Sequence, residues 1–247
     1  MKITFLGTNG WFDTSTGNTI CTLIETREFY LILDAGLGIQ HLDKYVKDDK
    51  PVYLFLSHLH FDHIYGLHIL PMFKFLKKLE IYTQPGTKEV LEKIISHPFM
   101  MPIEEMKYSV EIKEYSEENN LRPFQFKTGR LLHIDACFGF RFIIEDKTIV
   151  HCLDTGLDEK AVAISKNADI LITECSMPSG KSVGKWGHLN PQDAGNLALQ
   201  AQVKKAYLTH FSCTHFLNDQ DRIAARDTAR KIFPEIYNAA DGLTVEI

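Results

Sequence analysis

One run of six residues, His58-Leu59-His60-Phe61-Asp62-His63, constrains the structure of this chain more than any other stretch. It supplies three imidazoles and one carboxylate, the side chains that hold zinc and similar transition metals. The apolar segment 51–56 comes directly before it and has the length and the β-branched and aromatic content of a buried strand. Because residues i and i+2 of an extended segment face the same way, the spacing brings His58 and His60 together. The sequence therefore predicts a metal site at the end of a strand.

The composition of the 247 residues is that of a globular protein, with 45% hydrophobic residues, enough for a substantial core. We expect one domain over residues 1–247. The formal net charge of -5 gives no overall attraction to nucleic acid. Five scattered cysteines without a C-x-x-C pair indicate neither a disulfide framework nor a cysteine zinc site, which fits a cytoplasmic protein. We see no signal peptide and no run of transmembrane length, so we expect no membrane association.

Strand-like and helix-like segments alternate along the chain. We predict strands over 2–6, 19–26, 29–33, 51–56, 80–83, 110–115, 124–133, 138–144, 148–153, 169–174, 205–210 and 243–247. We predict helices over 37–46, 63–79 with an interruption near Pro71, 86–96, 158–166, 191–202 and 218–232, with Asn190 capping the helix that starts at Pro191. This mixture favours an α/β fold with two sheets covered by outer helices over two separate domains.

Residues that can bind metal or transfer protons stand at the ends of several predicted strands. They are Asp34, His58, His133, Asp154, Glu174 and His210. If these strand ends lie along one edge, the residues form a single site.

Taken alone, most of these residues also have a structural explanation. Asp34 could cap the helix that follows it. His133 could be a packed histidine in a strand, and Asp154 could be a turn former. His215 is close enough in sequence to compete with His210 for the same role.

Eight short motifs along the chain together resemble those of a known protein family. In chain order they are Phe5-Leu6-Gly7-Thr8, Leu33-Asp34-Ala35-Gly36, the H-x-H-x-D-H run, His133 followed by Gly139-Phe140-Arg141-Phe142, Asp154-Thr155-Gly156, the Glu174 segment, Gly187-His188-Leu189-Asn190, and Leu208-Thr209-His210-Phe211. In content, order and approximate separation they resemble the metallo-β-lactamase superfamily, and within it the ribonuclease Z and phosphodiesterase branch. The resemblance covers essentially the full length. It implies an αββα sandwich of two mixed β-sheets flanked by helices.

The resemblance also implies a centre with two divalent metal ions. The implied ligands are His58, His60 and His133 for one metal, and Asp62, His63 and His210 for the other, with Asp154 bridging the two. This set fits zinc, with manganese or iron as alternatives. The resemblance implies that Asp34 orients the histidine run without itself binding a metal.

The segment around His188 points to phosphate chemistry. Gly187-His188-Leu189-Asn190 is similar to the H-x-T loop of the ribonuclease Z branch, whose histidine contacts phosphate and can protonate the leaving group. Asn190 stands here in place of the usual threonine, which is a departure from the pattern of that branch. The resemblance pairs His188 with Glu174, and such a carboxylate favours the imidazolium form. The structural alternative is a surface histidine beside a helix.

We expect a metal-dependent hydrolase that cleaves a phosphodiester with a hydroxide activated by two metals, with Asp62 accepting a proton and His188 assisting the leaving group. Ribonuclease Z enzymes typically carry a protruding arm, commonly between the equivalents of His133 and Asp154. Here only 20 residues separate these positions, and they are predicted to form two strands with a tight turn. This favours a small or cyclic phosphodiester, such as a nucleotide, over a folded RNA, although an RNA 3′ end stays open.

Several alternatives remain open from the sequence. The same centre could hydrolyse a carboxylic ester, thioester or lactone, or the fold could serve a non-catalytic metal-binding carrier protein. Members of the family often form homodimers, so a homodimer is possible here. Residues 99–103 form an apolar loop that could cover the site as a lid or pack into the core.

Overall fold

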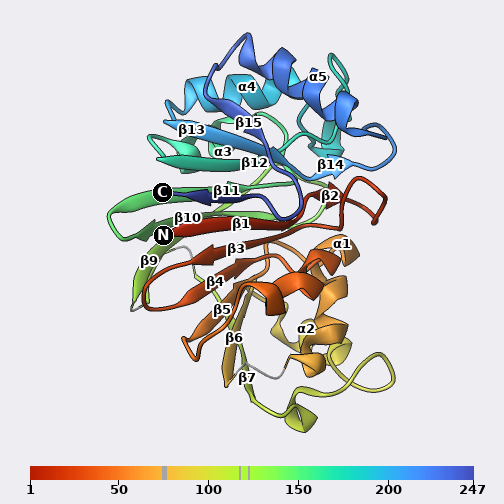
Figure 1. The fold of residues 1–247 in the computed structure, drawn as a ribbon, viewed down its shortest axis with the longest axis vertical. Helices are drawn as coiled ribbons and strands as arrows, with labels where there is room; N and C mark the ends of the chain where they lie inside the picture. The colour runs from red at the N-terminus through yellow and green to blue at the C-terminus, as the bar shows by residue number, and fades with distance from the viewer. Residues whose placement is uncertain (74–76, 117, 122) are drawn as a thin grey trace.

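The computed structural model describes residues 1–73, 77–116, 118–121 and 123–247. Within these residues the strands form two seven-stranded sheets and one two-stranded pair (Figure 1). The first sheet has the order β16 (Thr244–Glu246), β1 (Lys2–Gly7), β3 (Cys21–Glu25), β4 (Tyr30–Leu33), β5 (Val52–Phe55), β6 (Lys78–Thr83) and β7 (Ser109–Glu114). The second has the order β15 (Ile236–Asn238), β13 (Lys205–Thr209), β12 (Ile170–Glu174), β11 (Lys147–Cys152), β10 (Phe138–Ile144), β9 (Phe124–Arg130) and β8 (Glu118–Leu121). The small pair is β14 (Phe211–Ser212) with β2 (Asn9–Gly10).

Both sheets are mixed, and each has an antiparallel half and a parallel half. In the first sheet β4 to β7 run parallel, and in the second β11, β12, β13 and β15 do. Parallel neighbours need crossover connections, which here carry the helices onto the outer faces. The carboxyl ends of the parallel strands therefore share one edge in each sheet.

Three apolar layers hold the fold together. Between the sheets, the rings of Phe55 and Phe142 meet edge to face at 5.2 Å, inside a layer of fully buried aromatic and aliphatic side chains. Burying one such side chain contributes about 1.5–3 kcal/mol. The outer faces pack separately: Leu54 and Leu67 belong to the layer over the first sheet, and Leu171 and Leu197 to the layer over the second. The expected αββα sandwich is confirmed.

The helices lie on the two outer faces of this sandwich (Figure 1). Over the first sheet lie the 3-10 helices η1 (Leu37–Lys44), η2 (Tyr65–Met72) and η3 (Ile103–Glu105) and the α-helices α1 (Phe61–Ile64) and α2 (Lys88–Ile94). Over the second lie α3 (Glu159–Ser165), α4 (Pro191–Gln200) and α5 (Asp219–Arg230). The prediction at α4 is confirmed, because the Asn190 side chain accepts a hydrogen bond from the Asp193 backbone N–H and Pro191 occupies the first turn. None of the described helices is both long and apolar enough to cross a membrane.

Some expected elements differ from those observed. The helix predicted over 63–79 ends at Met72, and β6 already begins at Lys78, while residues 74–76 lie outside the described part of the chain. Periodicity could not separate an apolar 3-10 turn from a longer helix. Residues 37–44 also form a 3-10 helix, and β8 and β15 were missed.

The loop 99–103 does not behave as a lid in this structure. The Phe99 side chain is 74% exposed, whereas Met100 and Ile103 pack against the core over the first sheet. None of its residues lines the cavity described below.

Candidate metal centre

Sharp backbone turns at three strand ends aim side chains into one place. Asp34, Asp154 and His210 follow β4, β11 and β13 within two residues, and their φ angles are 59°, 48° and 48°. A non-glycine residue in this left-handed region costs about 1–3 kcal/mol and persists where the surrounding structure imposes it, often at functional sites. Aspartate and histidine tolerate the region better than most residues. These turns bring the strand ends of both sheets to a common point.

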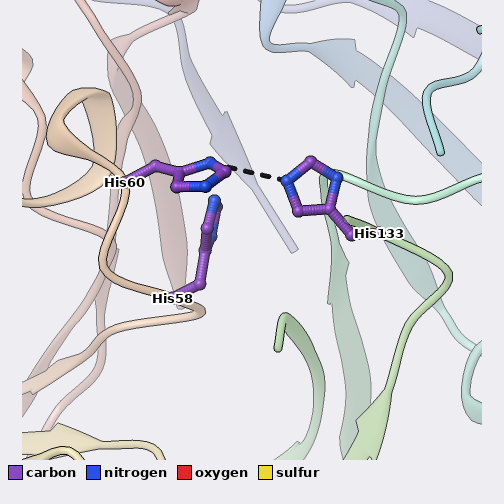
Figure 2. A group of neighbouring side chains, drawn as sticks. All are labelled: His58, His60 and His133. Carbon is purple, nitrogen blue, oxygen red and sulfur yellow. Dashed lines mark hydrogen bonds between the residues drawn. The ribbon is translucent and has the colours of Figure 1, made fainter. Parts of the chain in front are cut away.

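Three histidines make the first candidate ligand group. His58 and His60 come from the segment after β5, and His133 comes from the loop three residues beyond β9 (Figure 2). His60 Nδ1 lies 3.5 Å from His133 Nε2, and the possible ligand atoms of all three lie within 4.8 Å of one another. His133 therefore lies next to the histidine run despite being 70 positions after His63.

The second group contains Asp62, His63 and His210. His63 Nε2 lies 3.2 Å from His210 Nε2, which in turn lies 3.3 Å from Asp62 Oδ2. Asp154 touches both groups, with Oδ2 at 2.7 Å from His63 Nε2 and at 3.5 Å from His58 Nε2. The structure thus places all seven predicted ligands in one cluster, with Asp154 between the two groups.

The cluster is built to receive a cation. His58 Nε2 and Asp154 Oδ1 are buried atoms without a hydrogen-bond partner in the described structure. Such atoms are costly unless a ligand satisfies them. Burial, reinforced by the neighbouring His63, holds the pKa of His58 well below its usual value, so this imidazole stays neutral as a metal ligand requires. The donor set therefore fits divalent metal ions, of which the family resemblance implies two.

Opposing effects act on the other members of the cluster. Burial alone would lower the pKa of His63, but the carboxylates of Asp34, Asp62 and Asp154 outweigh it and raise that pKa well above its usual value. Burial alone would raise the pKa of Asp154, but His210 and His63 hold it well below the usual range. The field at His63 is therefore strongly negative, and a metal ion would take the place of its proton.

Residues outside the cluster orient the ligand histidines. Asp34 Oδ2 lies 2.9 Å from His63 Nδ1, which leaves Nε2 for the centre. His133 Nδ1 donates to the backbone oxygen of Trp186 at 2.6 Å, and His60 Nε2 contacts Asp135 Oδ2 at 2.8 Å. In each case the occupied nitrogen fixes which ring nitrogen can face a metal.

His188 lies beside the cluster and is paired with Glu174. Its Nδ1 is 3.0 Å and 3.2 Å from the two carboxylate oxygens of Glu174, and 3.3 Å from Asp154 Oδ1. Burial alone would lower the pKa of His188, but the Glu174 carboxylate outweighs it and raises the pKa to about 9. Glu174 is fully buried and also accepts a hydrogen bond from the Thr155 backbone N–H at 2.8 Å. Glu174 therefore favours the protonated form of His188, and the Nε2 of His188 remains for a ligand.

A cavity of about 410 Å³ opens over these groups. Its described lining residues are Gly10, Trp11, His60, Asp62, His133, Asp154, Ser176, Met177, Val183, Trp186, His188, His210, Ser212, Thr214 and His215. The volume is in the range of sites for small ligands.

A family model for the β-lactamase superfamily domain matches residues 30–211. The chain belongs to the β-lactamase superfamily. Residues 30–211 include every candidate ligand and the His188–Glu174 pair.

Superfamily relatives match along almost the whole chain. The probable metallo-hydrolase YhfI of Bacillus subtilis (strain 168) is 27% identical over 249 residues, which cover 96% of this chain and 94% of the relative. The crystal structure of YhfI, a metallo-β-lactamase fold protein, superposes with a TM-score of 0.80 at 25% identity over 99% of both chains.

Ribonuclease Z of Prochlorococcus marinus (strain MIT 9301) is 25% identical over 315 residues, covering all of both chains. Human tRNase Z, short form, has the same fold, with a TM-score of 0.78 at 20% identity over 100% of this chain and 99% of that chain. The resemblance to the ribonuclease Z branch is confirmed. The alignment with ribonuclease Z is longer than the 247 residues of this chain, so that relative contains segments absent here.

Several residues at this superfamily site were not singled out from the sequence. Ser176 Oγ lies 3.0 Å from His210 Nδ1, and the Trp11 backbone N–H donates to Asp62 Oδ2 at 2.7 Å. Ser176 could have been found from its position two residues beyond Glu174, at the end of β12. No local sequence pattern indicates a role for Trp11. His215 lines the cavity but belongs to none of the described ligand groups, whereas His210 belongs to two.

Asn190, where the branch usually has threonine, takes no part in the cavity lining. Its side chain caps α4 and donates to the Lys181 backbone oxygen at 2.9 Å. Both ends of the amide are therefore committed to the local structure, and the departure leaves His188 in place.

Proposed function

We propose that this chain is a metal-dependent phosphodiesterase acting on a small or cyclic phosphodiester. The His188–Glu174 pair carries the proposal, because it sets a cationic acid 3.3 Å from Asp154, in the middle of the candidate ligand cluster. A cation in this position suits the single negative charge of a phosphodiester. A neutral ester or lactone offers no such charge.

The candidate metals would be held by the two ligand groups, with zinc preferred and manganese or iron as alternatives. When bound, they supply Lewis-acid polarisation of a phosphoryl oxygen and a lowered pKa for water. Asp62, 14% exposed and on the cavity wall, is placed to accept a proton from attacking water. The water oxygen bonds to phosphorus as the ester P–O bond breaks, and His188 gives its proton to the departing oxygen. The products are a phosphomonoester and an alcohol.

The hairpin between β10 and β11 supports a small substrate. It turns through Glu145 and Asp146, whose φ angles are 47° and 62°, the left-handed pair typical of a two-residue hairpin turn. No arm can project from such a turn, which favours a small or cyclic diester over a folded RNA. In this proposal the 247 residues act as one domain.

Turnover of bis(p-nitrophenyl) phosphate by metal-loaded protein tests the reaction. His188→Ala and Asp154→Ala should each lower kcat/KM by about 100-fold or more. Undiminished turnover in both variants would contradict the assigned roles. Incubation with precursor transfer RNA and with cyclic nucleotides, side by side, separates the two substrate sizes.

The same preparation tests the alternatives. Hydrolysis of p-nitrophenyl acetate or a lactone without diester turnover would favour an acyl hydrolase. Bound metal without hydrolysis of any diester or ester would favour a metal-binding carrier. Elemental analysis of the native protein distinguishes zinc, manganese and iron.

A further inference from the structure

Two tryptophans line the cavity and are widely exposed. Trp11 is 70% exposed and Trp186 is 56% exposed. They are the only tryptophans in the chain. Indoles are usually well buried because they offer so much apolar surface. Two exposed indoles in the wall of one cavity therefore indicate a surface that a ligand covers.

Each tryptophan is tied by its main chain to a different half of the ligand cluster. The Trp11 backbone N–H donates to Asp62 Oδ2 at 2.7 Å, and the Trp186 backbone oxygen accepts from His133 Nδ1 at 2.6 Å. Asp62 belongs to one candidate ligand group and His133 to the other. A phosphate held at the cluster would thus have the backbone of one tryptophan anchored beside each half.

Trp11 is also held in a strained conformation. Its φ of 76° lies in the left-handed region, which a bulky residue rarely adopts. Asn9, two residues before Trp11, is held by hydrogen bonds of its side-chain amide. The amide nitrogen donates to the Gly17 backbone oxygen at 2.7 Å, and the amide oxygen accepts from the buried Arg222 guanidinium. Side-chain hydrogen bonds therefore hold the loop next to the exposed indole, and core packing does not account for that side chain.

The charge of the lining limits the ligand to few phosphates. Among the described lining residues there is no lysine or arginine. Proteins that bind polynucleotides follow the backbone with a positively charged groove. The other walls include the apolar side chains of Met177 and Val183. The lining therefore suits a ligand that carries one phosphate and a flat apolar group.

We infer that the substrate is a phosphodiester of a single nucleoside, whose base stacks on the indole of Trp11 or Trp186 while its phosphate lies at the ligand cluster. This inference rests on the proposed phosphodiesterase function and adds its substrate class. Stacking suits this role because every base has an aromatic face and indole is the largest aromatic side chain. It also accounts for the exposure of both side chains in a cavity whose described lining contains no lysine or arginine.

Two substrates with the same leaving group test the inference. Thymidine 5′-(p-nitrophenyl phosphate) and methyl p-nitrophenyl phosphate both release p-nitrophenol. They differ only in the other ester group, which is thymidine in the first and methyl in the second. Metal-loaded wild-type protein should prefer the thymidine ester by about 10- to 100-fold in kcat/KM, the size expected of one stacked base. The preference ratio should fall toward one in the Trp11→Ala/Trp186→Ala double variant, and the single variants assign the stacking residue. The corresponding Trp→Phe variants should keep much of the ratio.

Phe12→Ala is the matched control, since Phe12 is 49% exposed beside Trp11 and does not line the cavity. Its ratio should equal that of the wild type. A wild-type ratio near one, or a ratio that survives in the double variant, overturns the base-stacking inference while the phosphodiesterase proposal stands. Absence of turnover with both esters instead contradicts the phosphodiesterase proposal.

Tryptophan fluorescence gives a readout that does not depend on turnover, because both emitters lie at the site. Thymidine 5′-monophosphate should quench the emission of the metal-loaded protein saturably, and ribose 5-phosphate should quench it much less. Equal quenching by the two compounds would show that the base is not in contact with an indole.

Discussion

Asp34 Oδ2 lies 2.9 Å from His63 Nδ1, and neither side chain is exposed to solvent. The carboxylate is itself held by the Ser57 backbone N–H at 2.8 Å and the Ser57 hydroxyl at 3.0 Å. A candidate ligand histidine is therefore oriented by a buried anion that is fixed in turn. This relationship makes Asp34 a positioning residue for the metal centre.

Asp34→Asn should lower metal affinity by about 10- to 100-fold, because the orienting anion is lost. Asparagine tolerates the left-handed backbone at this position, so the fold should persist. Competition with a chelating dye measures the affinity. Asp135→Asn is the control: Asp135 also contacts a candidate ligand, His60, but is 68% exposed and should change affinity only a few-fold. Equal losses in the two variants would contradict the positioning role.

Diester hydrolysis should depend on the protonated form of His188. With a pKa raised to about 9, the rate should fall as the pH rises through about 9 and the proton is lost. In Glu174→Gln the carboxylate no longer offsets burial, so this falling limb should move to lower pH. The measurement is the pH dependence of kcat for a diester with an alkyl leaving group. An unmoved limb in Glu174→Gln would show that another group titrates there.

General acid catalysis by His188 also predicts a dependence on the leaving group. His188→Ala should cost more in kcat for an alkyl alcohol, which needs a proton, than for p-nitrophenolate, which leaves readily without one. Paired kinetics on the two diesters measure the difference. If both rates fall equally, His188 acts through phosphate contact alone.

His151 should make the protein sensitive to acid. It is fully buried, neither ring nitrogen has a hydrogen-bond partner in the described structure, and burial lowers its pKa from 6.5 to about 4. The native state thus binds a proton less readily than the unfolded chain. The stability it contributes is complete above about pH 6.5 and is lost as the pH falls toward 4, by roughly 3 kcal/mol in all.

His151→Leu should remove most of this loss. Urea unfolding across this pH range should show a shallower decline for the variant than for the wild type, whereas the exposed His68→Leu should decline like the wild type. Parallel curves for His151→Leu and the wild type would contradict the assignment.

The glycine before His188 should not accept a side chain. Gly187 has a φ of 61°, and an added Cβ would lie 1.8 Å from the Leu132 backbone oxygen. Gly187→Ala should therefore cost several kcal/mol of stability, about 1–2 of it from the backbone conformation. Gly180→Ala is the matched control, because Gly180 has a φ of 72° but open space around its Cβ position. Melting temperature and diester turnover measure both effects; similar values for the two variants would rule out the clash.

Local sequence pattern was informative where neighbours along the chain decide the structure. The strand before His58 and the cap at Asn190 formed as predicted, because alternation, capping and proline geometry act over a few residues. The same local reasoning failed over 63–79, where an apolar stretch fits more than one element. It also left His133 between a structural and a ligand role, since 70 positions separate it from His63.

The sequence alone predicts a cluster of imidazole and carboxylate groups at the end of a strand, and its motifs identify the superfamily. Which distant groups join that cluster depends on how the chain folds in three dimensions. The left-handed turns at Asp154 and His210 and the meeting of parallel strand ends from two sheets bring them together. The contacts of Trp11 with Asp62 and of Trp186 with His133 have no local sequence signature. The tryptophans contribute only backbone N–H and C=O groups, which nearly every residue type has. They arise from packing alone, and they place two indoles beside the centre that the histidine run predicted.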